Sequence, residues 1–416
     1  MTLVPSRLLP LSGNRSVLIL CLLVVAFISA CSRKVAPVKP GNVKVPPVQE
    51  KPEKEPAVEK KLDHSIGLLL PFELNTINLK NAKAKDIGKA DLAIDFYQGF
   101  KLALDSLSKN GHNYKLQVFD TQDQETRVVN LARAASVIDN DLIIGPVFPN
   151  ALSTFSEFTD PDPSKIIVYP LAASLPAKVE NPNLLMLNNT IDQHGWKIAD
   201  YITRTYHPDQ VNIVLVNTKK TDDEKFSAPV RKYISGLSKG KFQITERPNA
   251  IGLQSYLNVS KNNLVIISSS DRVFLTPTID KLYQLSRDNY RIEVFGHPNW
   301  LKATFLDGAK LQALKTKLSS SYFVDYKSPK VKHFIAHYRD EYGFDPSEFA
   351  FKGFDTGYYF GRLLEKYGNN YARHLTEESY KGLHNDFRFS KDSKAGYSND
   401  NLMLLTFRGL ELQPVK

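Results

Sequence analysis

Two histidines have the spacing of paired metal ligands. His333 and His337 lie four positions apart in a segment with a helical pattern, which is how zinc-binding helices place their ligands. The residue after His333 is Phe334, so the glutamate of a zinc protease motif is absent. Two solvated histidines on a helix are therefore the favoured interpretation, and the sequence predicts no metal site.

Three acidic residues follow a predicted strand. Paired carboxylates such as Asp120, Asp123 and Glu125 could act as acid and base or bind calcium. Their position directly before Thr126 favours another role, because negative charge at the start of a helix offsets the helix dipole. We therefore expect them to begin a helix.

A polar run, Ser268-Ser269-Ser270-Asp271, follows an apolar segment and precedes a helical pattern. Ser270 or Asp271 suits the N-cap of that helix. The same hydroxyl groups would lie at the carboxyl end of a parallel sheet, where open α/β folds bind ligands. Both interpretations stay open, since one residue can cap the helix while its neighbour faces a ligand.

Most catalytic motifs have no match in the sequence. It contains no G-x-S-x-G elbow, no P-loop and no G-x-G-x-x-G motif. Gly145-Pro146 follows a predicted strand where a phosphate loop would lie, but proline lacks the backbone N–H that such a loop uses. We therefore predict no catalytic residues, no cofactor and no enzyme.

From His64 onward, predicted strands alternate with predicted helices, and these elements must position the residues named above. Apolar runs with little polar alternation predict strands covered on both faces. These runs are residues 66–71, 115–119, 142–145, 166–170, 184–187, 211–216, 264–268 and 292–295. Helical patterns lie between them at 92–109, 126–138, 195–206 and 272–287, and later at 329–342 and 351–367, followed by late strands at 387–389 and 403–407. The alternation predicts an α/β fold with two doubly wound, Rossmann-like lobes.

The first 62 residues differ in composition. Residues 17–28 form an unbroken apolar run after Arg7 and Arg15, with no acidic residue in 1–30, which predicts a secretion signal. The run is short for a membrane span, although an uncleaved anchor helix is the alternative. Residues 31–62 are rich in Pro, Lys, Val and Glu and lack aromatic residues, so they are predicted to form a disordered tether.

Ile28-Ser29-Ala30-Cys31 resembles the lipobox of bacterial lipoproteins. The resemblance implies cleavage before Cys31 and a lipid on that cysteine, which would anchor the protein to a membrane in the cell envelope. The only other cysteine, Cys21, lies in the predicted signal, so no thiol remains for a disulfide or a redox motif. Ser32 follows the lipobox, which under a sorting pattern of some enteric bacteria favours the outer membrane, facing the periplasm.

The net charge of +10 is concentrated near the start of the chain. Residues 1–30 hold two basic residues, and residues 31–62 hold eight basic and four acidic residues, which leaves +4 for residues 63–416. No basic stripe interleaved with aromatic residues is visible. We therefore expect no nucleic-acid partner.

The order of six segments resembles the type I periplasmic binding proteins, which include the branched-chain amino-acid receptors of ABC transporters. The segments are DFYQGFKLALDSL (95–107), LQVFDTQDQETRVVNLARAAS (116–136), DLIIGPVFPNALSTFSE (141–157), IIVYPLAAS (166–174), IDQHGWKIADYI (191–202) and HYRDEYGFDPSEFAFKGFDTGYYF (337–360). The resemblance implies two lobes joined by three crossovers, with residues 64–188 plus 321–371 as lobe 1 and residues 189–320 plus 372–416 as lobe 2.

The same resemblance implies a set of ligand-binding residues. They are Phe148, Asn150, Ala172, Ala173 and Ser174 in lobe 1, and Phe226, Ser269, Ser270, His297 and Asn299 in lobe 2. The acid that meets the ligand ammonium in the family falls on Asn299, and the loop after Gly145 lacks the usual paired serines. Because a buried ammonium needs a compensating carboxylate, the ligand is expected not to be a standard α-amino acid.

Two functions are consistent with these features. The first is a membrane-anchored solute-binding lipoprotein that closes two lobes on a small ligand and works with an ABC permease. The second is a non-catalytic module that regulates a peptidoglycan synthase, because Gly145-Pro146 with a lipobox and tether is also similar to the lipoprotein activators of penicillin-binding proteins. Those activators carry an N-terminal helical-repeat domain that has no counterpart in this sequence.

Overall fold

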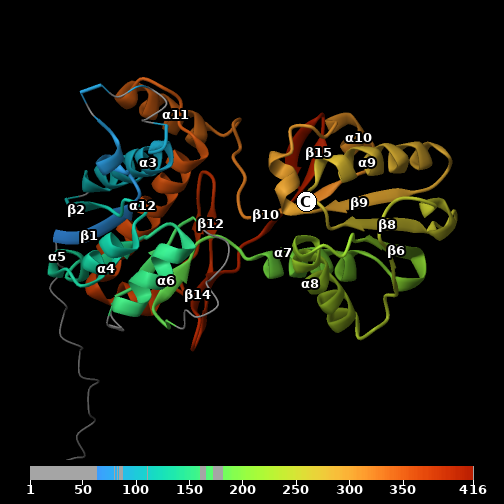
Figure 1. The fold of residues 1–416 in the computed structure, drawn as a ribbon, viewed down its shortest axis with the longest axis horizontal. Coiled ribbons are helices and arrows are strands. Elements are labelled where there is room, and N and C mark those ends of the chain that lie inside the picture. Colours follow the sequence, from blue (N-terminus) through green and yellow to red (C-terminus); the bar gives the residue numbers. More distant parts are fainter. Residues whose placement is uncertain are drawn as a thin grey trace, which may run out of the picture. The chain divides into compact units, whose positions relative to one another are not determined.

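The computed structural model describes residues 63–415 apart from 79, 82, 84–87, 110, 160–164 and 172–180. These residues form two lobes, each built around a seven-stranded sheet (Figure 1). The predicted signal segment, the tether and Cys31 lie outside the described residues. None of the helices in the described part combines the length and the apolar character that crossing a membrane requires.

Lobe 1 contains the first sheet, with strands in the order β13-β14-β5-β4-β3-β1-β2. Its strands are β1 (Asp63–Leu70), β2 (Asn113–Asp120), β3 (Leu142–Ile144), β4 (Ile167–Tyr169), β5 (Leu184–Met186), β13 (Phe389–Asp392) and β14 (Gly396–Asn399). Its helices are α3 (Asp91–Ser108), α4 (Glu125–Ala132), α5 (Ala135–Ile138), α6 (Pro149–Phe158), α11 (Pro329–Tyr342) and α12 (Glu348–Tyr367), with 3-10 turns η1 (Leu74–Thr76) and η5 (Gly368–His374). β11 (Tyr380–Lys381) and β12 (Asp386–Phe387) form a separate two-stranded sheet.

Lobe 2 contains the second sheet, with strands in the order β16-β15-β10-β9-β8-β6-β7. Its strands are β6 (Val211–Val216), β7 (Ile244–Arg247), β8 (Asn262–Ile267), β9 (Ile292–Gly296), β10 (Lys317–Ser320), β15 (Met403–Arg408) and β16 (Glu411–Pro414). Its helices are α7 (Ile191–Thr205), α8 (Thr221–Ser238), α9 (Arg272–Arg287) and α10 (Gly308–Ala313), with η2 (Pro208–Gln210), η3 (Leu253–Tyr256) and η4 (Pro298–Lys302).

The two sheets share the order of their first five strands and differ in the last two. In each sheet the first strand of the lobe pairs in parallel with both the second and the third, which makes it the point where the strand order reverses. In lobe 1 the seventh strand, β14, lies beside β5 and runs parallel to it, whereas in lobe 2 the sixth strand, β15, lies beside β10 and runs antiparallel to it. The α/β fold with two doubly wound lobes is therefore confirmed, and the lobes match in their five parallel strands but not in the two strands added at the far edge.

Apolar side chains cover both faces of each sheet, as the continuous apolar runs predict. In lobe 1, β1 sends Ile66 and Leu68 toward α3 and α12, while Leu69 packs on the other face with α4 and α6. In lobe 2, Val214 packs toward α9 and α10, and Leu215 packs toward α7 and α8. Both sheets therefore lie between two layers of helices.

Helices α3 and α12 lie side by side in lobe 1 at very short distance (Figure 1). Gly353 of α12 faces the backbone of α3, where a Cβ on this residue would lie 2.1 Å from the carbonyl oxygen of Phe96. Gly99 of α3 faces α12 in the same way, with a Cβ position 1.9 Å from the carbonyl oxygen of Ala350. The two glycines therefore set the helix spacing.

We expect Gly353→Ala to lower the free energy of unfolding by about 1–3 kcal/mol, because the added methyl group would push the two backbones apart. Urea denaturation followed by circular dichroism measures this. The matched control is Gly236→Ala in α8, where no atom lies within 4 Å of the added Cβ. Alanine there should raise stability by about 0.5–1 kcal/mol through helix propensity. Equal effects of the two variants would contradict the close-packing argument.

Three crossovers join the lobes: between β5 and α7, between β10 and α11, and between β14 and β15. The third corrects the expected boundary, because β13 and β14 pair within the first sheet. Residues 372–399 thus follow lobe 1, not lobe 2, and only β15 and β16 return to lobe 2. The sequence pattern misplaced this boundary because the late strands are short and carry polar residues that do not identify their sheet.

Asn399 ties the first and third crossovers together. Its side-chain amide donates to the carbonyl oxygens of Leu187 (3.1 Å) and Asp386 (3.0 Å), and its Oδ1 accepts from the backbone N–H of Asn401 (3.0 Å). Its own carbonyl oxygen accepts from Gln193 of α7 at 2.9 Å. The residue is fully buried, so these bonds form away from water.

Asp355 holds the second crossover indirectly. This buried carboxylate accepts backbone N–H bonds from Leu383, His384 and Asn385, each at 2.8 Å, and a bond from the Tyr380 hydroxyl at 3.0 Å. The loop that it organises then binds the crossover. His384 accepts from the N–H of Phe323 at 2.9 Å, and Asn385 donates to the carbonyl of Ser321 at 3.1 Å.

Candidate functional site

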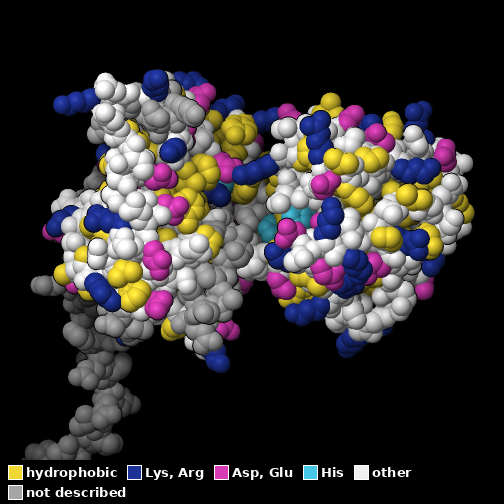
Figure 2. Space-filling model, viewed as in Figure 1, with side chains coloured by type: hydrophobic (Ala, Val, Ile, Leu, Met, Phe, Trp, Pro, Cys, Tyr) yellow, Lys and Arg dark blue, Asp and Glu magenta, His cyan; other side chains and the backbone are white. Residues whose placement is uncertain are grey.

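A polar cavity of about 600 Å³ lies at the carboxyl ends of β6, β8, β9 and β10 and extends to the crossovers. This is the edge at which parallel sheets bind ligands, beside the strand where the order reverses. Figure 2 shows histidine side chains at the surface of lobe 2, next to acidic side chains. The lining residues are Asn188, Asn189, Ile191, His194, Asp222, Asp223, Lys225, Ser268, Ser270, His297, Pro298, Asn299, Leu301, Lys302, Ser320, Ser321, Tyr322 and Lys352.

His297 begins η4 directly after β9 and is held in one orientation. Its Nδ1 accepts the backbone N–H of Asn299 at 3.1 Å, and the ring of Phe226 packs edge-on against it at 5.0 Å. Burial lowers the pKa of His297 to about 4, although Asp223 and Asp222 act in the opposite direction. The ring is therefore neutral at pH 7, and with Nδ1 accepting, its proton lies on Nε2.

His194 of α7 is the second buried histidine of the cavity. Its Nδ1 lies 2.9 Å from the hydroxyl of Ser319, and its Nε2 lies 3.5 Å from the hydroxyl of Ser321. Burial lowers the pKa of His194 to about 3, and the nearby His297 contributes in the same direction. The two histidines therefore provide neutral hydrogen-bonding groups.

Lys352 reaches the cavity from α12 of lobe 1. Lys352 is only 9% exposed. Its ammonium lies 5.4 Å from the centre of the Tyr322 ring. That ring stacks on His384 at 4.4 Å, so the second crossover forms an aromatic wall beside the lysine. Burial lowers the pKa of Lys352 to about 8, so the side chain still carries its charge at pH 7.

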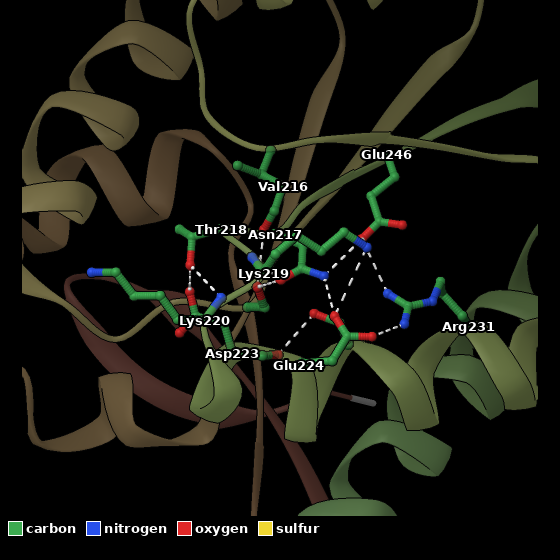
Figure 3. A network of polar contacts seen from close by, with 11 residues as sticks. Val216, Asn217, Thr218, Lys219, Lys220, Asp223, Glu224, Arg231 and Glu246 are labelled. Carbon is green, nitrogen blue, oxygen red and sulfur yellow. Dashed lines mark hydrogen bonds and ion pairs between the residues drawn. The ribbon is translucent and has the colours of Figure 1, made fainter.

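A polar network fixes the loop between β6 and α8 (Figure 3). The Asn217 amide donates to Glu224 at 2.6 Å and to Glu246 at 2.7 Å, and Arg231 and Lys219 neutralise these carboxylates. The network joins the loop to α8 and to β7. It places the first turn of α8, with Asp222 and Asp223, at the edge of the cavity. Its role is therefore to position this turn.

Most charges along the cavity already have partners. Lys225 pairs with Asp222 at 2.8 Å, and Lys302 pairs with Glu348 at 2.7 Å. Asp223 accepts a bond from the hydroxyl of Thr218 at 2.5 Å and lies in the first turn of α8, where the helix dipole stabilises its charge.

The structure divides the expected ligand residues into four groups. Ser270, His297 and Asn299 line the cavity. Phe226 is fully buried between α8 and the sheet, and Ser269 is buried with its carbonyl bonded to Trp300, so both support the site from behind. Phe148 and Asn150 lie at the start of α6 and do not line this cavity. Ala172, Ala173 and Ser174 lie outside the described residues.

The other candidate groups are structural. Asp120 accepts four backbone N–H bonds, from residues 72, 73, 74 and 122, which organises the loop after β1. Asp271 caps α9 by accepting from the N–H of Phe274 at 2.9 Å. His333 and His337 lie on α11, and the described residues contain no cluster of three His, Cys, Asp or Glu side chains that could hold a metal ion.

Lys352 and His194 are among the cavity residues that the sequence analysis did not identify. Lys352 lies in a helix where a lysine ordinarily faces water, and its burial depends on segments that are distant along the chain. His194 lies in a segment that resembles the binding-protein family, but neither its spacing nor its neighbours indicate a cavity. No pattern in the sequence identifies either residue.

No protein-family model and no curated protein matches the chain. Solved structures do match it. A branched-chain amino acid ABC transporter protein from Rhodospirillum rubrum shares 15% identity with a TM-score of 0.59, covering 85% of this chain and 100% of its own. An ABC transporter substrate-binding protein from Desulfitobacterium hafniense, solved with Leu, shares 14% identity with a TM-score of 0.53 and the same coverage. Full-length LpoA from Haemophilus influenzae shares 15% identity with a TM-score of 0.55, covering 84% of this chain and 58% of LpoA.

At these identities the similarity is one of fold. The chain has the two-lobed α/β fold of the type I periplasmic binding proteins, as its six segments implied.

Proposed function

We propose that the protein is an extracytoplasmic solute-binding protein that takes a small ligand into the cavity of lobe 2 and closes its two lobes on it. In this proposal lipid on Cys31 anchors the chain, the tether carries the lobes away from the membrane, and an ABC permease is the partner. The fold supports this function because proteins with it include substrate-binding proteins of ABC transporters.

The observation that carries the proposal is the cavity itself. It combines buried, oriented polar groups from lobe 2 with Lys352 from lobe 1, at the edge of the sheet where ligands bind in open α/β folds. Polar groups held by surrounding contacts, such as His297 between Phe226 and Asn299, are pre-organised for recognition.

The ligand is proposed not to be a standard α-amino acid. Asn299 lines the cavity where the family resemblance expects the acid that meets an ammonium group. Asp222 is already paired with Lys225, so it would have to exchange that partner to bind an ammonium.

A ligand screen tests this function. The full chain is heated with a panel of amides, carboxylic acids, sugars, peptides and cell-wall fragments, and hits are followed by small-angle scattering. We expect at least one compound to raise the melting temperature and to reduce the radius of gyration. Ser270→Trp places a large side chain in the cavity from an exposed position. This variant should bind that compound at least tenfold more weakly than the unaltered chain does. Ser235→Trp, on the exposed face of α8, should not lower the affinity.

Two results would contradict the proposal. The first is a panel in which no compound changes the melting temperature of the unaltered chain. The second is a hit that binds Ser270→Trp as tightly as the unaltered chain and leaves the scattering unchanged.

A second cavity favours the alternative function, a non-catalytic module that regulates a peptidoglycan synthase. It has a volume of about 820 Å³ and lies between the second crossover and β15–β16. Its lining includes Phe323, Phe351, Leu412 and Tyr326, the last 63% exposed. Apolar surface of this kind is typical of protein contacts. Tyr326→Asp should abolish capture of a partner under this function and leave small-ligand binding unchanged.

A further inference from the structure

The Lys352 ammonium is a buried charge whose hydrogen bonds are not satisfied by the protein. The residue is 9% exposed and lines the cavity. No described residue accepts a hydrogen bond from its Nζ, which lies over the face of the Tyr322 ring. A buried ammonium normally pairs with a carboxylate or with several carbonyl oxygens, because its desolvation is otherwise uncompensated.

The charged and titratable groups around Lys352 leave its charge uncompensated. On its own helix, Glu348 is engaged by Lys302 of η4 at 2.7 Å. From the second crossover Tyr322 presents its ring, and from the loop after β11 comes His384, whose pKa burial lowers to about 3. The neighbours therefore contribute one shared carboxylate, a second cation and two neutral rings.

The same cavity holds no competing unpaired cation among its described lining residues. Lys225 and Lys302 both have carboxylate partners. Ser321 lies beside Tyr322 at this end of the cavity, and its hydroxyl reaches His194 only at 3.5 Å. A hydroxyl and an ammonium at one end of a cavity form a donor set for an anionic group.

We propose that the ligand carries a carboxylate or phosphate group, and that this group binds the Lys352 ammonium at the crossover end of the cavity. The inference rests on the proposed function and specifies its ligand class. The uncharged part of the ligand then extends toward Asn299 and the Nε2–H of His297, which offer neutral hydrogen bonds. Because Lys352 belongs to lobe 1 and His297 to lobe 2, one ligand bound this way would bridge the lobes.

The test compares anions with matched neutral compounds. Acetate, lactate, benzoate and inorganic phosphate are titrated into the full chain by calorimetry, beside acetamide, lactamide and benzamide. We expect at least one anion to bind at least tenfold more tightly than its amide. Binding by carboxylates alone, or by phosphate alone, distinguishes the two sources of negative charge.

Lys352→Met removes the charge while keeping a long apolar side chain. The substitution should lower the affinity for the anion about 10- to 100-fold, as expected for the loss of a hydrogen bond to a charged group in a buried site. The matched control is Lys366→Met, the same substitution on the same helix at an exposed lysine that pairs with Glu378. It should change the affinity less than threefold.

The unaltered chain supplies a second measurement. Because the pKa of free Lys352 is about 8, carboxylate affinity should be constant from pH 5.5 to 7.5 and then fall tenfold per pH unit well above 8. His194 and His297 are neutral throughout this range, so they add no dependence.

The failure of this inference differs from the failure of the proposed function. Neutral compounds that bind in the cavity while every anion fails would overturn the inference and leave the function. An anion that binds with the same affinity to Lys352→Met, or with no loss of affinity at high pH, would also overturn it. A panel in which nothing binds would contradict both.

Discussion

Lys352→Met is expected to stabilise the protein without ligand by about 3 kcal/mol at pH 7. The buried ammonium has a pKa of about 8 in place of its ordinary 10.5, and each unit of that shift corresponds to about 1.4 kcal/mol. Methionine removes the buried charge and keeps the apolar contacts of the stem, a replacement that is often stabilising. If Lys352→Met gains stability and loses anion binding, the loss of binding does not result from unfolding of the variant.

The gain should depend on pH in a defined direction. The folded-state pKa of Lys352 lies below the unfolded value, so the unfolded chain binds more protons between about pH 8 and 10.5. The stability contribution of the lysine therefore rises over that window. The advantage of Lys352→Met should be complete below pH 8 and should vanish above about pH 10.5. Urea denaturation of both proteins at pH 7, 9 and 10.5 measures this, and a constant difference would contradict the buried-charge argument.

Asp355→Ala should lower the free energy of unfolding by about 3–5 kcal/mol, the largest effect that we expect. The carboxylate accepts three backbone N–H bonds and one hydroxyl bond and is fully buried. Burial raises the pKa of Asp355 to about 6, so the group is ionised at pH 7. Alanine would leave all four donors without a partner in the interior, and each loss has a substantial cost.

Asp392→Ala is the matched control, because Asp392 also accepts two backbone N–H bonds, from Lys394 at 2.8 Å and Ala395 at 2.9 Å, but at an exposed turn. Water can replace the carboxylate there, so the loss should be below about 1 kcal/mol. Hydrogen exchange should locate the effect of Asp355→Ala in residues 321–324 and 383–385. Losses of similar size in both variants would contradict the role of burial.

The central strands of both sheets could be predicted from the sequence because their residues are apolar at nearly every position. A run such as Val211–Val216 is apolar at nearly every position, so it is stable only when both faces are covered. β10 was missed because Lys317–Ser320 contains a lysine and two serines, and it pairs with β9 and β15 through its backbone. β14 was missed for the same reason, since Gly396–Asn399 has only Tyr397 as a large apolar residue.

The candidate site was predicted in part, and the physical reason differs between residues. Ser270, His297 and Asn299 follow apolar strands, so their position at the sheet edge can be inferred from the local sequence. Phe226 also lies near this edge, but its direction depends on the helix face that α8 presents to the sheet, where it packs fully buried. Lys352 depends on the packing of three segments from different parts of the chain, which no local pattern encodes.

The third crossover has a consequence for the order in which the chain becomes foldable during its synthesis. Each lobe needs segments that lie far apart in the sequence. In lobe 1, for example, Tyr114 donates to the carbonyl of Gly361, 247 positions later, and lobe 2 gains β15 and β16 only from residues 403–414. While the chain emerges N-terminus first, the apolar face of α3 has no α12 to cover it, and such contacts between distant segments form slowly. Nearly the whole chain must therefore be available before either lobe can close its core, and a holding chaperone would protect the exposed strands until then.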